Sequence, residues 1–289
     1  MPIPGLTIIG ESINDSVPST KKLFEANDVD GILALAKAQD EKGAGYIDVN
    51  VGRRPPPFMG DLVRKVQKVT AKPLSIDSPD FDIVEAGLKA YNPARTSGQM
   101  PVLNSISPLR LQMFDLLKIQ PFMPILMISE RVEKGVSLPN QTVQETCETA
   151  RYMVQQARQL VHGIPNSQLI LDPGIAPLGS DSEGITRRVL DTMRTIHNDP
   201  DFAGIHFSVG LSNFTHMLPP KRADGSPVKG PLESAFLTLA MPLGLDMIIG
   251  STVRKYELLP AGHPALVCLE DILRLGGFDA ILRIQEFYS

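Results

Sequence analysis

Residues 73–78 read Pro-Leu-Ser-Ile-Asp-Ser, and the apolar run within them begins at a proline and closes on the carboxylate of Asp77. A short run of this kind, bounded by turn-forming residues, is typical of a buried strand in a parallel sheet. The chain repeats the form in residues 6–10, 46–51, 101–105, 124–129, 168–172, 204–210 and 246–250. Together with 73–77 these runs predict eight strands.

Amphipathic segments separate the predicted strands. Two clear helical stripes are Val29, Ile32, Leu33 and Ala36, and then Ala150, Val154, Ala157 and Val161. Every gap between the strands is long enough for the crossover that parallel strands require. The alternation predicts an α/β protein, a (β/α)8 TIM barrel formed as one domain by residues 1–289. A doubly wound open sheet is the competing arrangement, because periodicity does not distinguish closed from open parallel sheets.

The composition restricts the partners of this protein. Hydrophobic residues make up 43% of the chain and charged residues 21%, which is typical of a globular protein with a substantial core. The formal net charge of -4 and the scattered Lys and Arg residues disfavour binding to a phosphate backbone, so we expect no nucleic-acid partner. Cys147 and Cys268 provide neither a disulfide framework nor a CxxC metal motif.

Targeting signals are not evident in the sequence. Residues 1–6 lack a basic segment followed by an apolar one, and no uncharged apolar stretch of 18 residues follows later. We therefore expect a cytoplasmic protein that does not enter a membrane. The scarcity of cysteine agrees with a reducing compartment.

Compact polar residues stand at or just after the ends of most predicted strands. In chain order they are Glu11, Ser12, Asn14, Asp48, Asn50, Asp77, Asn104, Ser107, Asp172, Ser212 and Asn213. Each of them alone could cap a helix or bend a turn. Capping does not require carboxylates and carboxamides at successive strand ends, however, and in a barrel these ends surround the mouth where ligands bind.

A ring of acceptors and amides suits a flat, nitrogen-rich heterocycle such as a pterin. Asp77 and Asp172 could accept hydrogen bonds from its amino and ring N–H groups, and Asn104 could both donate and accept. A phosphate-binding GxxxxGK[ST] or GxGxxG loop is not found where a strand meets a helix, and neither is a GxSxG elbow. The histidines include no HExxH motif and no i, i+4 pair, so we expect no protein-bound metal and assign them to packing or the surface. His216 is the histidine that we expect nearest to a ligand.

The motifs at the strand ends resemble the pterin-binding methyltransferase family, which includes methyltetrahydrofolate:corrinoid protein methyltransferases and the folate domain of cobalamin-dependent methionine synthase. The resemblance covers nearly the whole chain. It rests on Ile9-Gly10-Glu11-Ser12-Ile13-Asn14, Asp48-Val49-Asn50-Val51-Gly52, Ser75-Ile76-Asp77-Ser78, Asn104-Ser105-Ile106-Ser107, Asp172-Pro173-Gly174-Ile175 and Gly210-Leu211-Ser212-Asn213, which occur in the family's order. Two positions depart from the family pattern, Ser12 in place of Arg, and Pro79-Asp80 where an Asn is common.

The resemblance implies an enzyme that moves a methyl group between N5 of tetrahydrofolate and the cobalt of a corrinoid carried by a partner protein. By the same resemblance Asp77, Asn104 and Asp172 would hold the pterin ring, and Asn213 would face N5. Asp48, Asn50, Glu11 and Ser212 would complete the site. The family also implies a homodimer, which composition does not address.

Two other functions remain open at this point. A dihydropteroate synthase-like pterin transferase would share the Asp77 and Asp172 motifs, but it should carry a basic motif where this chain has Ser212-Asn213-Phe214. A non-catalytic folate-binding protein would bind the ligand without turnover. For a corrinoid partner we expect residues 55–59 and 214–219 to form exposed apolar docking loops, with 55–57 and 221–230 as loops above the barrel.

Overall fold

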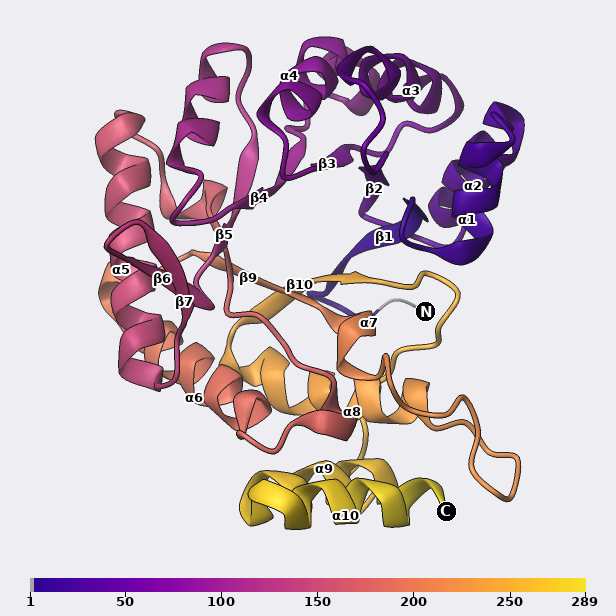
Figure 1. Ribbon diagram of the computed structural model, residues 1–289, viewed down its shortest axis with the longest axis vertical. Coiled ribbons are helices and arrows are strands. Elements are labelled where there is room, and N and C mark those ends of the chain that lie inside the picture. Colours follow the sequence, from indigo (N-terminus) through magenta and orange to yellow (C-terminus); the bar gives the residue numbers. More distant parts are fainter. Residues whose placement is uncertain (1–2) are drawn as a thin grey trace.

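The fold is a closed barrel of parallel strands surrounded by helices (Figure 1). The computed structural model describes residues 3–289, so Met1 and Pro2 of the N-terminal stretch considered above lie outside the described residues. The strands neighbour one another in the order β1-β10-β9-β8-β5-β4-β3-β2. Their bounds are β1 Thr7–Asn14, β2 Tyr46–Asn50, β3 Leu74–Asp77, β4 Val102–Ile106, β5 Met123–Met127, β8 Ile170–Asp172, β9 His206–Gly210 and β10 Leu245–Gly250. The predicted (β/α)8 barrel is confirmed, and the open sheet is excluded.

Each predicted strand coincides with a barrel strand, but the first one was predicted too short. β1 runs past Gly10 to Asn14, and its register with β2 shifts between Gly10 and Ile13 before pairing resumes at Ile13 with Val49. Glu11, Ser12 and Asn14 therefore lie within the strand and do not follow it. The register shift is typical of a β-bulge, which redirects side chains at a barrel rim.

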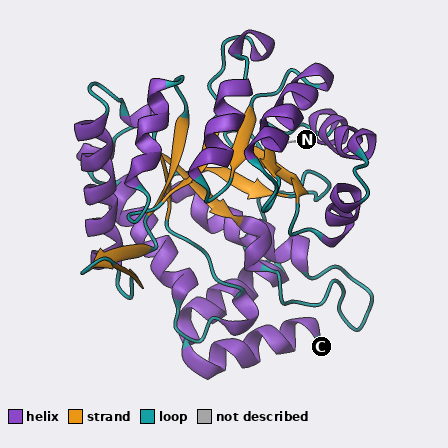
Figure 2. Cartoon of the chain, turned by 45° about the horizontal axis from the view of Figure 1, so that its top comes forward, coloured by secondary structure: helices purple, strands orange, loops and turns teal. Residues whose placement is uncertain are grey.

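Helices connect the strands along the outside of the barrel (Figure 2). The α-helices are α1 Pro18–Glu25, α2 Val29–Glu41, α3 Pro56–Val69, α4 Phe81–Ala90, α5 Val143–Leu160, α6 Ile185–His197, α7 Leu211–Phe214, α8 Lys229–Ala240, α9 Pro264–Leu275 and α10 Gly277–Tyr288. Short 3-10 helices are η1 Pro93–Thr96, η2 Leu111–Lys118, η3 Asn166–Gln168, η4 Leu178–Ser180, η5 Pro200–Phe202 and η6 Met241–Leu243.

Side-chain caps determine where several of these helices begin. Asp28 accepts a hydrogen bond from the Gly31 amide at the start of α2, and Asp80 accepts from the first-turn amides of α4. Thr142 and Glu145 form a reciprocal capping box at α5. Asp80, one of the departures from the family pattern, thus has a local structural role.

The Pro55-Pro56-Pro57 stretch is not a loop, contrary to our prediction. α3 begins at Pro56, because proline lacks only an amide hydrogen that the first helical turn leaves unpaired and its fixed φ suits that position. The loop predicted at 221–230 is confirmed as far as Val228, where α8 begins at the next residue.

The crossover between β4 and β5 is a 3-10 helix, η2, where an α-helix was expected. Only a short segment between Pro108 and Pro121 is available there. Its buried residues Met113 and Leu116 are three positions apart, the repeat of a 3-10 helix.

Two apolar clusters stabilise the barrel. One contains Ile9, Val102, Ile125, Ile170 and Met247 from five different strands, and these residues fill the barrel interior. The larger cluster joins the outward faces of the strands to the surrounding helices. Helix α9 contributes Leu266, Leu269 and Ile272 to it and packs between α8 and α10 (Figure 1).

An antiparallel hairpin, not predicted from the sequence, follows β5. It consists of β6 Glu130–Glu133 and β7 Val136–Pro139, joined by Lys134 and Gly135. Both connecting residues have positive φ, at 51° and 79°, as a type I′ turn requires. The hairpin pairs only with itself and lies apart from the barrel strands (Figure 2).

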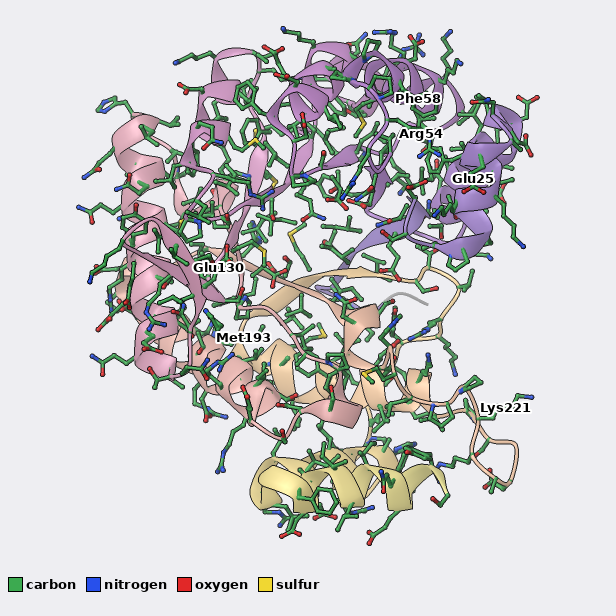
Figure 3. The ribbon with its side chains drawn as sticks, viewed as in Figure 1. Glu25, Arg54, Phe58, Glu130, Met193 and Lys221 are labelled. Carbon is green, nitrogen blue, oxygen red and sulfur yellow. The ribbon has the colours of Figure 1, made fainter. Side chains whose placement is uncertain are left out.

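Arg54 joins the loops that follow β1 and β2. Its guanidinium group lies 4.4 Å from the ring centre of Phe24 and 5.7 Å from that of Phe58, and it binds Asp15 at 2.7 Å. Figure 3 labels Arg54 and Phe58 beside one another. This stacked ion pair fixes the chain at one side of the mouth.

No helix of the described residues is both long and apolar enough to cross a membrane.

His206 and Asp246 form an ion pair between β9 and β10. His206 Nδ1 lies 2.6 Å from Asp246 Oδ2, and Nε2 lies 3.2 Å from the carbonyl oxygen of Ser167. Both partners accept hydrogen bonds, so the doubly protonated ring satisfies them best. The Asp246 hydrogen bond raises the pKa of His206, against the opposing effect of burial.

We predict that His206→Gln lowers the free energy of unfolding by up to about 1 kcal/mol at pH 6 and by less at pH 9. Because the folded-state pKa is raised, the stabilisation is complete below the unfolded value near 6.5 and is lost as pH rises through the folded value. Urea unfolding at both pH values measures the difference. The exposed His162, changed to Gln, serves as control, and an equal loss at both pH values would contradict the prediction.

Candidate active site

A cavity of about 770 Å³ opens at the carboxyl ends of the barrel strands. Six of the predicted site residues line it, namely Glu11, Asp48, Asp77, Asn104, Asp172 and Asn213. The other two, Asn50 and Ser212, are hydrogen-bonded to members of this set. The structure thus brings together all the residues that the sequence singled out for one site.

Asp77 and Asn104 are neighbours across β3 and β4, where they pair in register. Asn50 Nδ2 donates to Asp77 Oδ2 at 2.8 Å, and Asn50 Oδ1 accepts from the Gly52 amide at 2.9 Å, which fixes the orientation of the carboxamide. Burial raises the pKa of Asp77 to about 6, while the bond from Asn50 acts in the opposite direction. Asp77 therefore titrates near neutral pH.

Asp48 lies on β2, the strand next to β3, and is only 1% exposed. Burial and then the negative charge of Asp77 raise the pKa of Asp48 well above its ordinary value. Two adjacent buried carboxyls rarely ionise together, so burial beside Asp77 favours the protonated form of Asp48 over the ionised form. Among the described residues, Asp48 Oδ1 has no hydrogen-bond partner, which leaves a buried polar atom at the cavity for a ligand to satisfy.

Asp172 closes β8 on the opposite side of the cavity floor. Its Oδ1 accepts from the Gly174 amide at 2.8 Å, and Ser208 Oγ donates to Oδ2 at 3.4 Å. Burial raises the pKa of Asp172 to about 6, against the lowering effect of the Gly174 amide. Gly174 has a φ of +71°, and a Cβ there would come within 2.7 Å of the Ser129 side chain, so only glycine allows this turn.

Asn213 lies on the short helix α7, directly after β9. The apolar residues on either side, Leu211 and Phe214, are buried, and the Phe214 ring packs 5.1 Å from that of Phe236. A Cβ at Gly210 would lie 2.9 Å from Asn213 Nδ2, so glycine provides the space for this side chain. α7 is thus anchored from below, while the Asn213 carboxamide is exposed to the cavity.

Hydrogen bonds hold the segment around α7 from two directions. Ser212 Oγ donates to Glu11 of β1, and burial raises the pKa of Glu11 while Ser212 and Arg254 oppose the shift. Thr215 Oγ1 donates to the fully buried Glu233, which also forms an ion pair with Arg254. These contacts position Asn213 relative to β1 and β10.

Some polar residues at the predicted strand ends lie outside the cavity. Ser12 donates its amide to Gln39 Oε1, and Ser107 Oγ accepts from Arg110. His216, which we expect to be the histidine nearest to a ligand, is exposed and is not among the residues that line the cavity. Asn14, by contrast, lines it.

The sequence did not reveal the outer wall of the cavity. It includes Glu130, Ser137 and Pro139 of the hairpin, Ile175 and Ala176 after β8, and Ile185 and Arg188 of α6. Figure 3 labels Glu130 at the edge of the opening. The alternation of residues 130–139 around Lys134-Gly135 is a hairpin signal that could have pointed to part of this wall.

The chemistry of the cavity suits a planar ring rich in N–H groups. Its floor offers carboxyls whose pKa values are raised, and Asn104 adds a donor and an acceptor. Within residues 3–289 no cluster of three or more His, Cys, Asp or Glu side chains has the arrangement of a metal site.

Residues 13–250 match the family described as pterin binding enzyme. This match spans most of the chain, so the protein belongs to that family and is an enzyme of the pterin-binding class. The resemblance drawn from the motifs is thereby confirmed.

A particular relative is the methylcorrinoid:tetrahydrofolate methyltransferase of Eubacterium limosum, which is 29% identical over 250 residues covering 84% of each chain. Solved structures with the same fold include the dihydropteroate synthase of Xanthomonas albilineans with 4-aminobenzoic acid, at a TM-score of 0.60, 17% identity, and coverage of 98% of this chain and 95% of that one. The Yersinia pestis dihydropteroate synthase with a sulfonamide drug has a TM-score of 0.56 and 14% identity, with coverage of 97% and 93%. At these identities the two synthases establish the fold alone.

We predict that Asp172→Asn stabilises the protein at pH 8. The ordinary pKa of 3.8 rises to about 6 on folding, so an ionised Asp172 opposes folding by up to about 3 kcal/mol above pH 6. Asparagine keeps the acceptor for the Gly174 amide without the charge. The gain should fall by about half at pH 5, because the folded carboxyl is then protonated. Urea unfolding at both pH values tests this, and a variant less stable than the parent at pH 8 would contradict it.

Proposed function

We propose that this enzyme transfers a methyl group between N5 of tetrahydrofolate and the cobalt of a corrinoid carried by a partner protein. The observation that carries the proposal is the Asn213 carboxamide, held at the rim of an acidic cavity in a pterin-binding enzyme. The name of the Eubacterium limosum relative agrees with both substrates.

In the proposed complex the pterin ring lies on the cavity floor. Asp77 and Asp172 accept hydrogen bonds from its amino and ring N–H groups, and Asn104 pairs with the neighbouring ring edge. The unpartnered Asp48 Oδ1 supports this orientation, because a donor from the ring would remove an unsatisfied buried acceptor. Asn50 acts by orienting Asp77.

Asn213 acts at N5 in this proposal. A methyl group leaves a tertiary amine only when positive charge develops on the nitrogen, so N5 must be protonated or strongly hydrogen-bonded in the transition state. The carboxamide oxygen accepts from a protonated N5, and its N–H donates to the neutral nitrogen. Asn213 cannot itself supply the proton, which comes from water or from the ligand network.

The methyl group moves by direct in-line displacement, and the corrinoid supplies the nucleophilic cobalt or the methyl, depending on direction. The chain contributes the position and hydrogen bonding of the folate. The reaction needs no covalent intermediate between the methyl group and the protein. The homodimer that the family resemblance implies and the cytoplasmic location expected from the sequence remain parts of this proposal.

The synthase alternative lacks support at the end of β9. A basic motif is expected there for the aryl substrate, and this chain has Ser212, Asn213 and Phe214. The synthase structures share the fold at 17% and 14% identity, and identities this low do not indicate a shared substrate. A purely folate-binding protein would bind the same ligand, so only a measurement of turnover distinguishes it from the proposed enzyme.

The docking surface predicted for the corrinoid protein needs correction. Met59 on α3, Phe214 on α7 and Leu218 just after α7 are buried in the core. The strongly exposed apolar side chains in the segments that follow barrel strands include Leu109, Val136, Met217 and Val253, at 47%, 58%, 65% and 67% exposed. We propose that these residues surround the mouth and receive the partner.

Asn213→Ala should lower kcat/KM for methyl transfer about a hundredfold, because a hydrogen bond to the developing charge on N5 is lost. Cobalt absorbance, followed anaerobically with a methylated corrinoid and tetrahydrofolate, gives the rate. Tetrahydrofolate binding should change much less. The exposed Asn198, changed to Ala, is the control, and an unchanged rate in Asn213→Ala would remove the assigned role.

A double variant, Met217→Glu with Val253→Glu, should raise KM for the corrinoid protein about tenfold, because charges would have to be buried at the interface. Free methylcobalamin does not require docking, so the ratio of the two rates isolates the effect. Leu282→Glu on α10, far from the mouth, should leave the ratio as it was. A ratio of the two rates in the double variant equal to that of the parent protein would show that the partner docks elsewhere.

A further inference from the structure

Arg188 is the single Lys or Arg side chain among the residues that line the cavity. It is half-buried, and within the described part of the chain it forms no ion pair or side-chain hydrogen bond. Glu11, Asp48, Asp77, Asp172 and Glu130 line the same cavity. A guanidinium group facing an acidic cavity without a protein partner is a site for an anionic part of the ligand.

The start of α6 is fixed, which holds Arg188 in place. Asp181 accepts hydrogen bonds from the amides of Ile185 and Thr186, both at 2.7 Å, and caps the helix. Ile185 and Arg188 are three positions apart, so they share a helix face. Both side chains line the cavity. Arg188 is therefore presented by a rigid element.

Apolar residues also line the cavity beyond the carboxyl groups of its floor. Ile175 and Ala176 come from the segment after β8, Ile185 from α6, and Pro139 from the hairpin. The cavity thus combines a floor of carboxyl and carboxamide groups, an apolar wall and one cation. A volume of about 770 Å³ also falls within the range of about 300–1,000 Å³ that is typical for a whole drug-sized ligand.

We infer that Arg188 binds the glutamate carboxylate of the folate tail, while the apolar wall contacts the aminobenzoyl ring. This inference rests on the proposed function. The three regions of the cavity match the three parts of a reduced folate, which are a donor-rich pterin, an aromatic ring and a dicarboxylate. Carboxylates on the floor repel the glutamate, so Arg188 also sets the direction in which the ligand enters.

Glu130 provides an independent check on this assignment. Its Oε2 accepts from Ser137 Oγ at 2.7 Å across the hairpin, so its charge is held at the same opening. In Figure 3 Glu130 and Met193 of α6 are labelled on the same side of the barrel. A fixed negative charge there weakens the binding of an anionic tail, and its removal should have the opposite effect to loss of Arg188.

The test compares two ligands, tetrahydrofolate and the tail-less 6-methyltetrahydropterin, by anaerobic calorimetry at low salt. Arg188→Gln should raise Kd for tetrahydrofolate about tenfold and leave Kd for 6-methyltetrahydropterin unchanged, because only the former carries carboxylates. Glu130→Gln should lower Kd for tetrahydrofolate about twofold. Arg187→Gln, on the exposed adjacent residue, is the matched control.

The outcomes separate this inference from the proposed function. Equal weakening of both ligands by Arg188→Gln, or no weakening of either, would overturn the tail assignment and leave the pterin site standing. So would equal affinity of the unmodified protein for the two ligands. If the unmodified protein binds neither ligand, the proposed function and the tail assignment fall together.

Discussion

The burial of carboxyl groups at the ends of neighbouring strands is the constraint on which the site depends. Removing an ionised carboxylate from water costs several kcal/mol. A cluster of buried carboxyl groups therefore persists only where a rigid fold imposes it. The closed barrel does this, because adjacent parallel strands end side by side and cannot separate. Asp48 and Asp77 are held at one side of the floor and Asp172 at the other. The resulting rise in their pKa values allows protonated and ionised groups to coexist near neutral pH.

The floor is rigid for the same reason that it is acidic. Asn50 fixes Asp77, the Gly174 amide fixes Asp172, and the buried pair Leu211 and Phe214 anchors the helix that carries Asn213. A ligand that satisfies these groups does so without reorganising them, which is the condition for electrostatic catalysis. Instability that is local to the floor is offset by the two apolar clusters of the barrel.

Much of this arrangement was predictable from the sequence, because strand runs and their terminal polar residues are local signals. Asp77, Asn104 and Asp172 could be placed at one mouth once eight parallel strands were assigned, since closure brings strand ends together. Arg188 could not, because its position depends on how α6 packs, and a lone arginine in a helix has no distinguishing pattern. The exposure predicted for the 55–59 and 214–219 segments was wrong for Met59 and Phe214, because apolar residues near turns can face either way and packing decides which are buried.

The hairpin of β6 and β7 pairs only with itself, through a turn of two residues. Its hydrogen-bond ladder is therefore independent of the barrel registers. Insertions, deletions or substitutions in it can reshape one wall of the cavity while the strand ends that form the floor keep their spacing. The enzyme thus separates the part that holds the reacting ring from a part that can diversify. Sequence changes in the hairpin can therefore alter which ligands are accepted without destabilising the barrel.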